Sequence, residues 1–206
     1  MCRSHGHGGA FTRSAWTSAR RTPPLYPDAV TLLPEAGPAD VLTAVDTAPG
    51  CSVKDSFARL DLSGAGFTPI VEAQWIDRPA HRPAPRSSTP WAAVSTAHEL
   101  AEWTAAWNDG ATDLFRPQLL ARPAVRVLAA RRDGAIVAGA VVNRSWPVTG
   151  VSNLFTSDGD LDEAWTGVLS ALPDRHVVGY ETGPPLAAAL RLGFTSTGPL
   201  RVRLKT

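Results

Sequence analysis

The segment from Val125 to Thr206 alternates between short runs of strand character and amphipathic runs of helix character. Asp133-Gly134 lies between two runs of strand-forming residues, which is a strong hairpin signal, so residues 125–131 and 136–143 are expected to pair. Further strands are expected at 150–155, 176–180 and 199–204, and helices at 160–172 and 184–192. This alternation indicates a mixed α/β fold.

The preceding segment adds elements of both kinds. Thr96 and Glu99 have the spacing of a capping box at the start of a helix whose apolar stripe includes Leu100 and Trp103. Residues 78–90 are rich in Pro and Arg and are expected to form a linker. The other expected elements are strands at 29–33 and 67–76 and helices from Pro38, at 53–62 and at 115–121.

These patterns divide the chain into three parts. Residues 1–27 show no apolar periodicity and are expected to be a disordered tail. Residues 28–66 are expected to form an N-terminal accessory lobe, and residues 67–206 a larger domain. Gly66-Phe67 repeats the pair Gly193-Phe194, which hints at an internal duplication.

Composition excludes several classes of protein. The 206 residues carry a formal net charge of +1, which gives no basic footprint for nucleic acid. No apolar run approaches the roughly 20 residues that a membrane span needs. Two cysteines cannot build a disulfide framework, so we expect a reducing cytoplasm. Cys2, His5 and His7 lack a fourth metal ligand, so we expect no metal site.

The order of elements from residue 67, namely strand, helix, helix, hairpin, strand, helix, strand, helix, strand, resembles the GNAT superfamily of acyl-CoA-dependent N-acyltransferases. Residues 186–194, with their terminal Gly-Phe, look like that family's last helix. The resemblance implies a mostly antiparallel central sheet flanked by helices, here with an N-terminal α/β extension. It also implies acetyl-CoA or another acyl-CoA as the cofactor.

In that family the strand equivalent to 150–155 splays from its neighbour, and acyl-CoA enters the gap. The resemblance therefore assigns cofactor binding to the backbone of this strand, to the turn after it and to the start of the last helix. The residues are Asn153, Leu154, Phe155, Thr156, Gly159 and Thr182. Fixed backbone donors could also polarise the thioester carbonyl.

The turn after this strand departs from the family pattern. A glycine-rich phosphate cradle is replaced by Ser157-Asp158-Gly159-Asp160, followed by Asp162 and Glu163. Acidic residues cap a helix well, and they compete for the N–H donors that a phosphate would use. A phosphate would then need basic groups from elsewhere, such as Arg144 or Arg191.

The candidate catalytic residues are Glu181 and Tyr180. Glu181 could act as the base for a substrate ammonium, or it could be a strand-end carboxylate that faces solvent. Tyr180 could be an acid or a half-buried aromatic residue. The tyrosine that the family often places in its last helix corresponds to Ala189. Three tryptophans outside the expected core stripes could form pocket walls: Trp75, Trp91 and Trp146.

Three functions remain open. The first is an N-acyltransferase that moves an acyl group to an amine of a small molecule or of a protein. The second is a catalytically inactive GNAT-fold module that binds a small molecule or a protein. The third is a structural or dimerisation domain, which a cleft closed by side chains would support; a homodimer is compatible with each of these functions.

Overall fold

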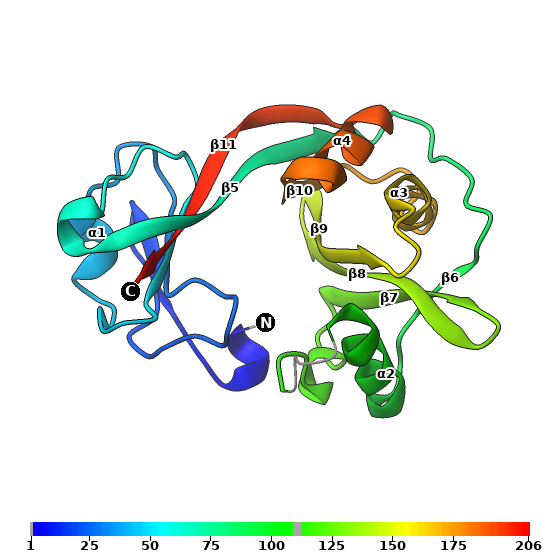
Figure 1. The fold of residues 1–206 in the computed structure, drawn as a ribbon, viewed down its shortest axis with the longest axis horizontal. Coiled ribbons are helices and arrows are strands. Elements are labelled where there is room, and N and C mark those ends of the chain that lie inside the picture. Colours follow the sequence, from blue (N-terminus) through cyan, green and yellow to red (C-terminus); the bar gives the residue numbers. More distant parts are fainter. Residues whose placement is uncertain (1, 109–112) are drawn as a thin grey trace. The chain divides into compact units, whose positions relative to one another are not determined.

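The computed structural model describes residues 2–108 and 113–206. The chain divides into two compact units (Figure 1): an N-terminal unit of residues 1–74 and 198–206, and a C-terminal unit of residues 75–197. Strands β5 (Phe67–Arg78) and β11 (Thr195–Lys205) contribute residues to both units. This division differs from the boundary expected at residue 67. A strand of 12 residues is about 40 Å long, so it can pack in one unit at its start and in the other at its end.

The N-terminal unit is a small sheet with one short helix. Its strand order is β1-β2-β3-β4-β11-β5, in which β3 and β4 are parallel and β4 and β11 antiparallel. Its elements are η1 (Cys2–His5), β1 (Ala10–Phe11), β2 (Ala15–Thr17), β3 (Ala29–Thr31), α1 (Pro38–Leu42), β4 (Ser52–Asp55) and η2 (Ser63–Ala65). Its core consists of Ala15, Ala29, Val41, Cys51, Val53, Leu60, Leu62 and Phe67.

Residues 2–27 differ from the expected disordered tail because a buried carboxylate organises the segment that follows β2. Asp28 is 2% exposed. It accepts hydrogen bonds from the backbone N–H groups of Thr22 (2.7 Å) and Ser52 (3.0 Å) and from the Arg21 guanidinium (2.9 Å). A buried charge persists only with such partners. These hydrogen bonds hold the polar segment after β2 against β4. The segment has too few apolar residues to pack there without them.

The helix expected at 53–62 is wrong. Residues 52–55 form strand β4, and the chain then turns. The cause is Asp55, whose buried carboxylate accepts hydrogen bonds from the N–H groups of Phe57 (3.2 Å) and Leu60 (2.7 Å). An aspartate that binds nearby N–H groups offers the backbone an alternative to the helix. Ala58 is left-handed, with a φ of 54°, which also interrupts a helix.

The C-terminal unit is a larger sheet with three α-helices among its described residues. The strand order is β5-β10-β9-β8-β7-β6, in which β6 to β9 are antiparallel neighbours and β9 and β10 are parallel. Its elements are β6 (Trp91–Ala93), α2 (Ala97–Trp107), η3 (Pro117–Leu119), β7 (Val125–Arg132), β8 (Ala135–Ser145), β9 (Val148–Thr156), α3 (Leu161–Ser170), β10 (Val177–Glu181) and α4 (Gly183–Arg191). The mixed, mostly antiparallel sheet with flanking helices confirms the expected fold class.

Helices cover both faces of this sheet, with α3 and α4 on one face and α2 on the other (Figure 1). On the α3 and α4 face, Leu128 and Val151 pack with Trp165 in the main apolar core. On the opposite face, the Trp103 indole of α2 donates to the Leu128 carbonyl (2.9 Å) and meets the Phe155 ring edge-on at 5.2 Å. Side chains therefore alternate between two buried faces along each central strand.

The helix starts agree with the capping signals. Thr96 accepts from the Glu99 N–H (3.1 Å) while Glu99 accepts from the Thr96 N–H (3.1 Å), which confirms the capping box of α2. Asp160 caps α3 by accepting from the Glu163 N–H (2.9 Å). The helix expected at 115–121 is only the short 3-10 turn η3, which Pro117 opens.

The two units share one succession of elements. Each has an antiparallel strand pair, a third strand antiparallel to the second, a helix, and a fourth strand parallel to the third. In both, a left-handed glycine, Gly66 (φ 78°) or Gly193 (φ 89°), precedes a buried phenylalanine, Phe67 or Phe194. The topology is the one expected of an internal duplication, in which β11 pairs with β4 and β5 lies next to β10.

Gly139 of β8 is required by the packing on the α2 face. A Cβ at this position would overlap the Trp103 and Phe155 rings. We predict that Gly139→Ala lowers the free energy of unfolding by about 1–3 kcal/mol, because two packed rings must separate. Urea denaturation measures the change. Gly150→Ala is the matched control, since its Cβ would lie 3.7 Å from the Asn143 carbonyl, an ordinary contact. Equal losses in the two variants would contradict this account of Gly139.

Candidate functional site

The parallel pair β9 and β10 diverges soon after it begins. Thr149 pairs with Val177 and Gly150 with Val178, and no later pair joins these strands among the described residues. The Val151 carbonyl still lies close to Gly179, and β9 continues to Thr156, so its edge from Ser152 onward runs beyond the pairing with β10. This confirms the expected splay of the strand at 150–155 from its neighbour.

A β-bulge at Asn153 accompanies the divergence. β8 and β9 shift register between Gly139, which pairs with Phe155, and Val141, which pairs with Ser152. Asn153 is left-handed, with a φ of 53°. One extra residue in a bulged strand reverses the facing of the side chains that follow. Leu154 consequently packs on the α3 face, whereas Phe155 packs against Trp103 on the α2 face.

Glu181 lies at the same end of the sheet as the bulge. Because β9 and β10 run in the same direction, their C-terminal ends meet at one edge. Counted from the pair of Thr149 with Val177, both Asn153 and Glu181 lie four residues further on. The predicted base, Glu181, and the predicted backbone site around Asn153 are therefore at the same distance along their two strands from this pair.

Glu181 and Tyr180 occupy opposite faces of β10. Successive side chains of a strand alternate, and Val177, which has the same facing as Glu181, is in the core beneath α3 and α4. Tyr180 has the other facing and meets the Trp75 ring edge-on at 5.6 Å. The two candidate catalytic side chains are thus not brought together. Thr182 is the N-cap residue of α4, and its side chain makes no capping hydrogen bond.

Burial changes the acidity of both groups. Burial raises the pKa of the Glu181 carboxyl to about 7. Burial, together with the charge of Glu181, raises the pKa of the Tyr180 phenol. A carboxyl with a pKa near neutrality can accept a proton at physiological pH and release it again, as a general base must.

The acidic turn satisfies its own backbone. Asp158 accepts hydrogen bonds from the Thr156 hydroxyl (2.6 Å) and the Asp160 N–H (3.1 Å). Asp160 accepts from the Glu163 N–H (2.9 Å), and the Leu161 N–H donates to the Gly159 carbonyl (2.9 Å). Side chains and backbone of the turn thus occupy donors that a phosphate would use at a helix start.

Two arginines partly balance this turn. Arg132 reaches Asp158 (3.3 Å), and Arg191 reaches Asp162 (2.7 Å) in an exposed pair. Of the four carboxylates at residues 158, 160, 162 and 163, two are therefore paired with a guanidinium group. Arg144, the other predicted phosphate partner, donates to the Pro123 carbonyl (3.2 Å).

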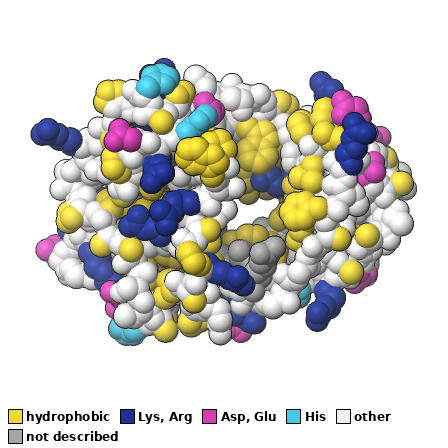
Figure 2. Space-filling model, turned by 180° about the vertical axis from the view of Figure 1, so that it is seen from behind, with side chains coloured by type: hydrophobic (Ala, Val, Ile, Leu, Met, Phe, Trp, Pro, Cys, Tyr) yellow, Lys and Arg dark blue, Asp and Glu magenta, His cyan; other side chains and the backbone are white. Residues whose placement is uncertain are grey.

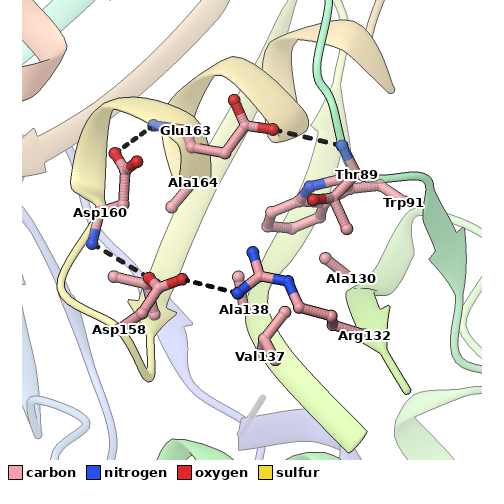
Figure 3. A pocket seen from close by; sticks show the side chains of 11 residues that line it. Thr89, Trp91, Ala130, Arg132, Val137, Ala138, Asp158, Asp160, Glu163 and Ala164 are labelled. Carbon is pink, nitrogen blue, oxygen red and sulfur yellow. Dashed lines mark hydrogen bonds and ion pairs between the residues drawn. The ribbon is translucent and has the colours of Figure 1, made fainter. Parts of the chain in front are cut away.

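A small pocket, open to solvent, lies beside the first turn of α3 (Figure 3). Its floor is apolar and includes Ala130, Ala138 and Ala164, and its rim carries Arg132 and Glu163. Trp91 forms one wall of this pocket, as predicted, whereas no pattern in the sequence predicted its other lining residues. The acidic turn was the sequence feature that could have indicated the pocket, because Asp158, Asp160 and Glu163 line it.

The remaining sequence candidates do not join the site. Ala189, at the position of the family's tyrosine, is fully buried in the core. Trp146 is 93% exposed and lines no pocket that the structure describes. Among the described residues, no group of three His, Cys, Asp or Glu side chains could hold a metal ion.

The surface carries charges of both signs, as the net charge of +1 requires. Basic and acidic side chains occur together on the face shown in Figure 2. In the described part of the chain, no helix has the length and apolarity needed to span a membrane.

The pKa of Glu181 predicts how stability depends on pH. The folded state favours the protonated carboxyl, so it binds more protons than the unfolded state between pH 4.5 and about 7. The contribution of this group to stability is therefore full below that window and is lost as the pH rises through it. Relative to wild type, we predict that Glu181→Gln gains about 1–2 kcal/mol between pH 4.5 and pH 8, after allowance for screening of a partly exposed group.

Urea denaturation at both pH values tests this prediction. Glu35→Gln, which removes an exposed carboxyl from the N-terminal unit, is the matched substitution with which Glu181→Gln is compared. A constant difference between Glu181→Gln and wild type at the two pH values would show that the carboxyl titrates normally.

Comparison with solved structures places the fold. No family profile matches the chain, and no curated protein matches it by sequence. A GCN5-related N-acetyltransferase from Kribbella flavida superposes with a TM-score of 0.60 at 14% identity, covering 97% of this chain and 89% of that one. A GNAT-family protein from Novosphingobium aromaticivorans has a TM-score of 0.57 at 14% identity, covering 96% and 91%.

A further similar structure is a conserved protein of unknown function from Staphylococcus epidermidis, with a TM-score of 0.59 at 10% identity, covering 77% of this chain and 73% of that one. At these identities the similarity concerns the fold. The splayed parallel pair, the mixed sheet and these structural neighbours together show that the chain has the fold of the GNAT superfamily.

Proposed function

We propose that this protein is an N-acyltransferase that moves an acyl group from acyl-CoA to an amine. The observation that carries the proposal is the edge of β9, whose residue pairs with β10 end at Gly150, at the same end of the sheet as a half-buried carboxyl at Glu181. An extended ligand can pair with the backbone of such an edge as an added strand would. The structural neighbours described as N-acetyltransferases support the same chemistry by analogy.

The backbone around the bulge fits the pantetheine arm of acyl-CoA. Asn153, Leu154 and Phe155 would offer N–H and C=O groups along the unpaired edge, and Thr156 and Gly159 follow in the turn. Thr182 would contribute its hydroxyl from the start of α4, where it makes no capping hydrogen bond. When bound, acyl-CoA supplies the thioester, and a fixed N–H beside the carbonyl stabilises charge that develops on its oxygen.

Glu181 is the proposed general base. An amine must lose its proton before it can attack a thioester, and a carboxyl with a pKa of about 7 can take that proton directly or through water. Tyr180 remains the candidate acid for the departing thiolate. Its raised pKa keeps the phenol protonated, as an acid must be, but its facing on β10 directs it away from Glu181.

The acceptor is an amine of a small molecule or of a protein. Deprotonation by Glu181 suits a primary amine, which is an ammonium ion at neutral pH. A homodimer is compatible with this proposal, and solution scattering would measure it.

A second candidate function is a GNAT-fold module that binds a ligand without catalysis. The turn at the start of α3 supports it, because the Asp160 and Glu163 N–H groups already have side-chain acceptors. An enzyme with this turn would bind phosphate weakly there. The two candidates differ in whether removal of the Glu181 carboxyl abolishes activity.

Calorimetric titration with acetyl-CoA tests the proposal and the role of the bulge together. We predict binding to wild type, a similar affinity for Asn153→Gly, and about tenfold weaker binding for Asn153→Val. Glycine adopts a φ of 53° freely, whereas a β-branched residue costs about 1–2 kcal/mol there and favours a strand without the bulge.

Circular dichroism should show all three proteins folded. Absence of heat and of a thermal shift with millimolar acetyl-CoA in wild type would end the proposal. Equal affinities for Asn153→Gly and Asn153→Val would instead exclude a role for the bulge in binding.

The pH dependence of acyl transfer tests the base. For wild type we predict that kcat/KM rises with pH up to about 7 and then levels, because only ionised Glu181 accepts a proton. Glu181→Gln should lower kcat/KM by about a hundredfold or more and remove this inflection, while acetyl-CoA still binds. The non-catalytic alternative gains support if no amine is acylated by wild type although acetyl-CoA binds.

A further inference from the structure

The linker between β5 and β6 is held at both ends by charged side chains. At its start, the Arg78 guanidinium is buried and donates to the carbonyls of Leu192 (3.1 Å), Arg82 (3.3 Å) and Pro83 (2.6 Å). Leu192 follows the last turn of α4. At its end, the linker meets Glu163 in the first turn of α3. Residues 79–90 thus form a strap, which runs past the α3 and α4 pair in Figure 1.

Four donors converge on a single oxygen of Glu163. The Ser88 N–H (2.9 Å) and the Ser88 hydroxyl (2.8 Å) donate to Oε1. The Ser87 hydroxyl is shared between Oε1 (2.8 Å) and the Thr89 carbonyl (2.7 Å), and the Thr89 N–H between Oε1 (3.3 Å) and the Ser87 hydroxyl (3.2 Å). The N–H groups of consecutive residues and their hydroxyls make a concave site for an anion. We call residues 87–89 the nest; Figure 3 shows its bond from Thr89 to Glu163.

The nest opens onto the pocket beside α3. Thr89 and Glu163 both line this pocket, and Ser88 is exposed. Arg132 lines the same pocket, as do Asp158 and Asp160. Asp158 is paired with Arg132, and Asp160 accepts from the Glu163 N–H, so both carboxylates have partners of their own. An anion that entered the pocket would find its free donors in the nest only if Glu163 left it.

We propose that the nest is a phosphate-binding site that Glu163 occupies as an internal substitute, so that an incoming phosphate displaces the carboxylate and takes its place on the strap. The donor set of two N–H and two O–H groups suits a phosphate oxygen as well as a carboxylate oxygen. This inference rests on the proposed function only in the source of the phosphate, which acyl-CoA would supply. It gives the chain a phosphate site in the linker in place of the one that the acidic turn has lost.

Amide hydrogen exchange of the full chain tests the proposal, with inorganic pyrophosphate as the probe. In Glu163→Ala the Ser88 amide should exchange about tenfold faster than in wild type, because it loses its acceptor. The Thr89 amide should change less, because it keeps the Ser87 hydroxyl as an acceptor. Millimolar pyrophosphate should restore their protection in this variant and have a smaller effect in wild type, where the carboxylate competes. Asp162→Ala is the matched control, since it changes the same helical turn but not the nest.

Glu163→Gln provides a second variant with the fold kept, because its amide oxygen remains an acceptor; its protection should lie between those of wild type and Glu163→Ala. Unchanged exchange in Glu163→Ala, or no protection by pyrophosphate, overturns the proposal. Protection by pyrophosphate but not by acetyl-CoA would uphold the nest and contradict acyl-CoA as the source of the phosphate.

Discussion

The candidate site on β9 depends on the β-bulge at Asn153, where β9 has one residue more than the paired segment of β8. β9 contacts helices on both faces of the sheet, and the bulge at Asn153 allows Leu154 to pack toward α3 while Phe155 packs against Trp103 of α2. Without the extra residue, each side chain after it would turn to the opposite face. The same bulge bends the strand and increases its twist, which is consistent with the loss of pairing to β10 after Gly150. The packing of Leu154 and Phe155 on opposite faces of β9 therefore depends on the bulge.

The start of α3 shows how a helix can satisfy its own terminus. In a phosphate-binding helix the first N–H groups stay free for the ligand. Here Asp158 and Asp160 accept from these groups, so the helix is stable without any ligand. Glu163 likewise accepts hydrogen bonds from backbone N–H groups of the linker, those of Ser88 and Thr89. The carboxylates that stabilise the helix are thus the groups that any phosphate in this region must displace or avoid.

Local signals in the sequence predicted most of the C-terminal unit. The Asp133-Gly134 hairpin, the capping box of Thr96 and the cap at Asp160 each act within a few residues, and the structure has all three. The N-terminal unit was harder, because its order depends on Asp28 and Asp55, buried carboxylates whose partners lie up to 24 residues away. The bulge at Asn153 was also invisible, since only the packing of both faces of β9 requires it. The nest depends on a contact across 75 residues between Ser88 and Glu163.

The shared succession of elements raises the question of why residues 28–66 should not hold a second site. In the N-terminal unit the parallel pair β3 and β4 also has two residue pairs, Ala29 with Val53 and Val30 with Lys54. Immediately beyond them, the Thr31 hydroxyl donates to the buried Asp55 carboxylate (3.5 Å) and accepts from the Ser56 N–H (2.8 Å). These side chains link β3 and β4 at the position that corresponds to Val151 and Gly179 in the C-terminal unit. A buried carboxylate with several donors is costly to displace, so this pair is fixed as structure. Asp55 of β4 and Gly179 of β10 both stand two residues beyond the first pair. A Cβ at Gly179 would lie only 3.0 Å from the Val151 carbonyl, so the two backbones are close at this point. At the corresponding point of the N-terminal unit, Thr31 and Asp55 are instead joined through their side chains.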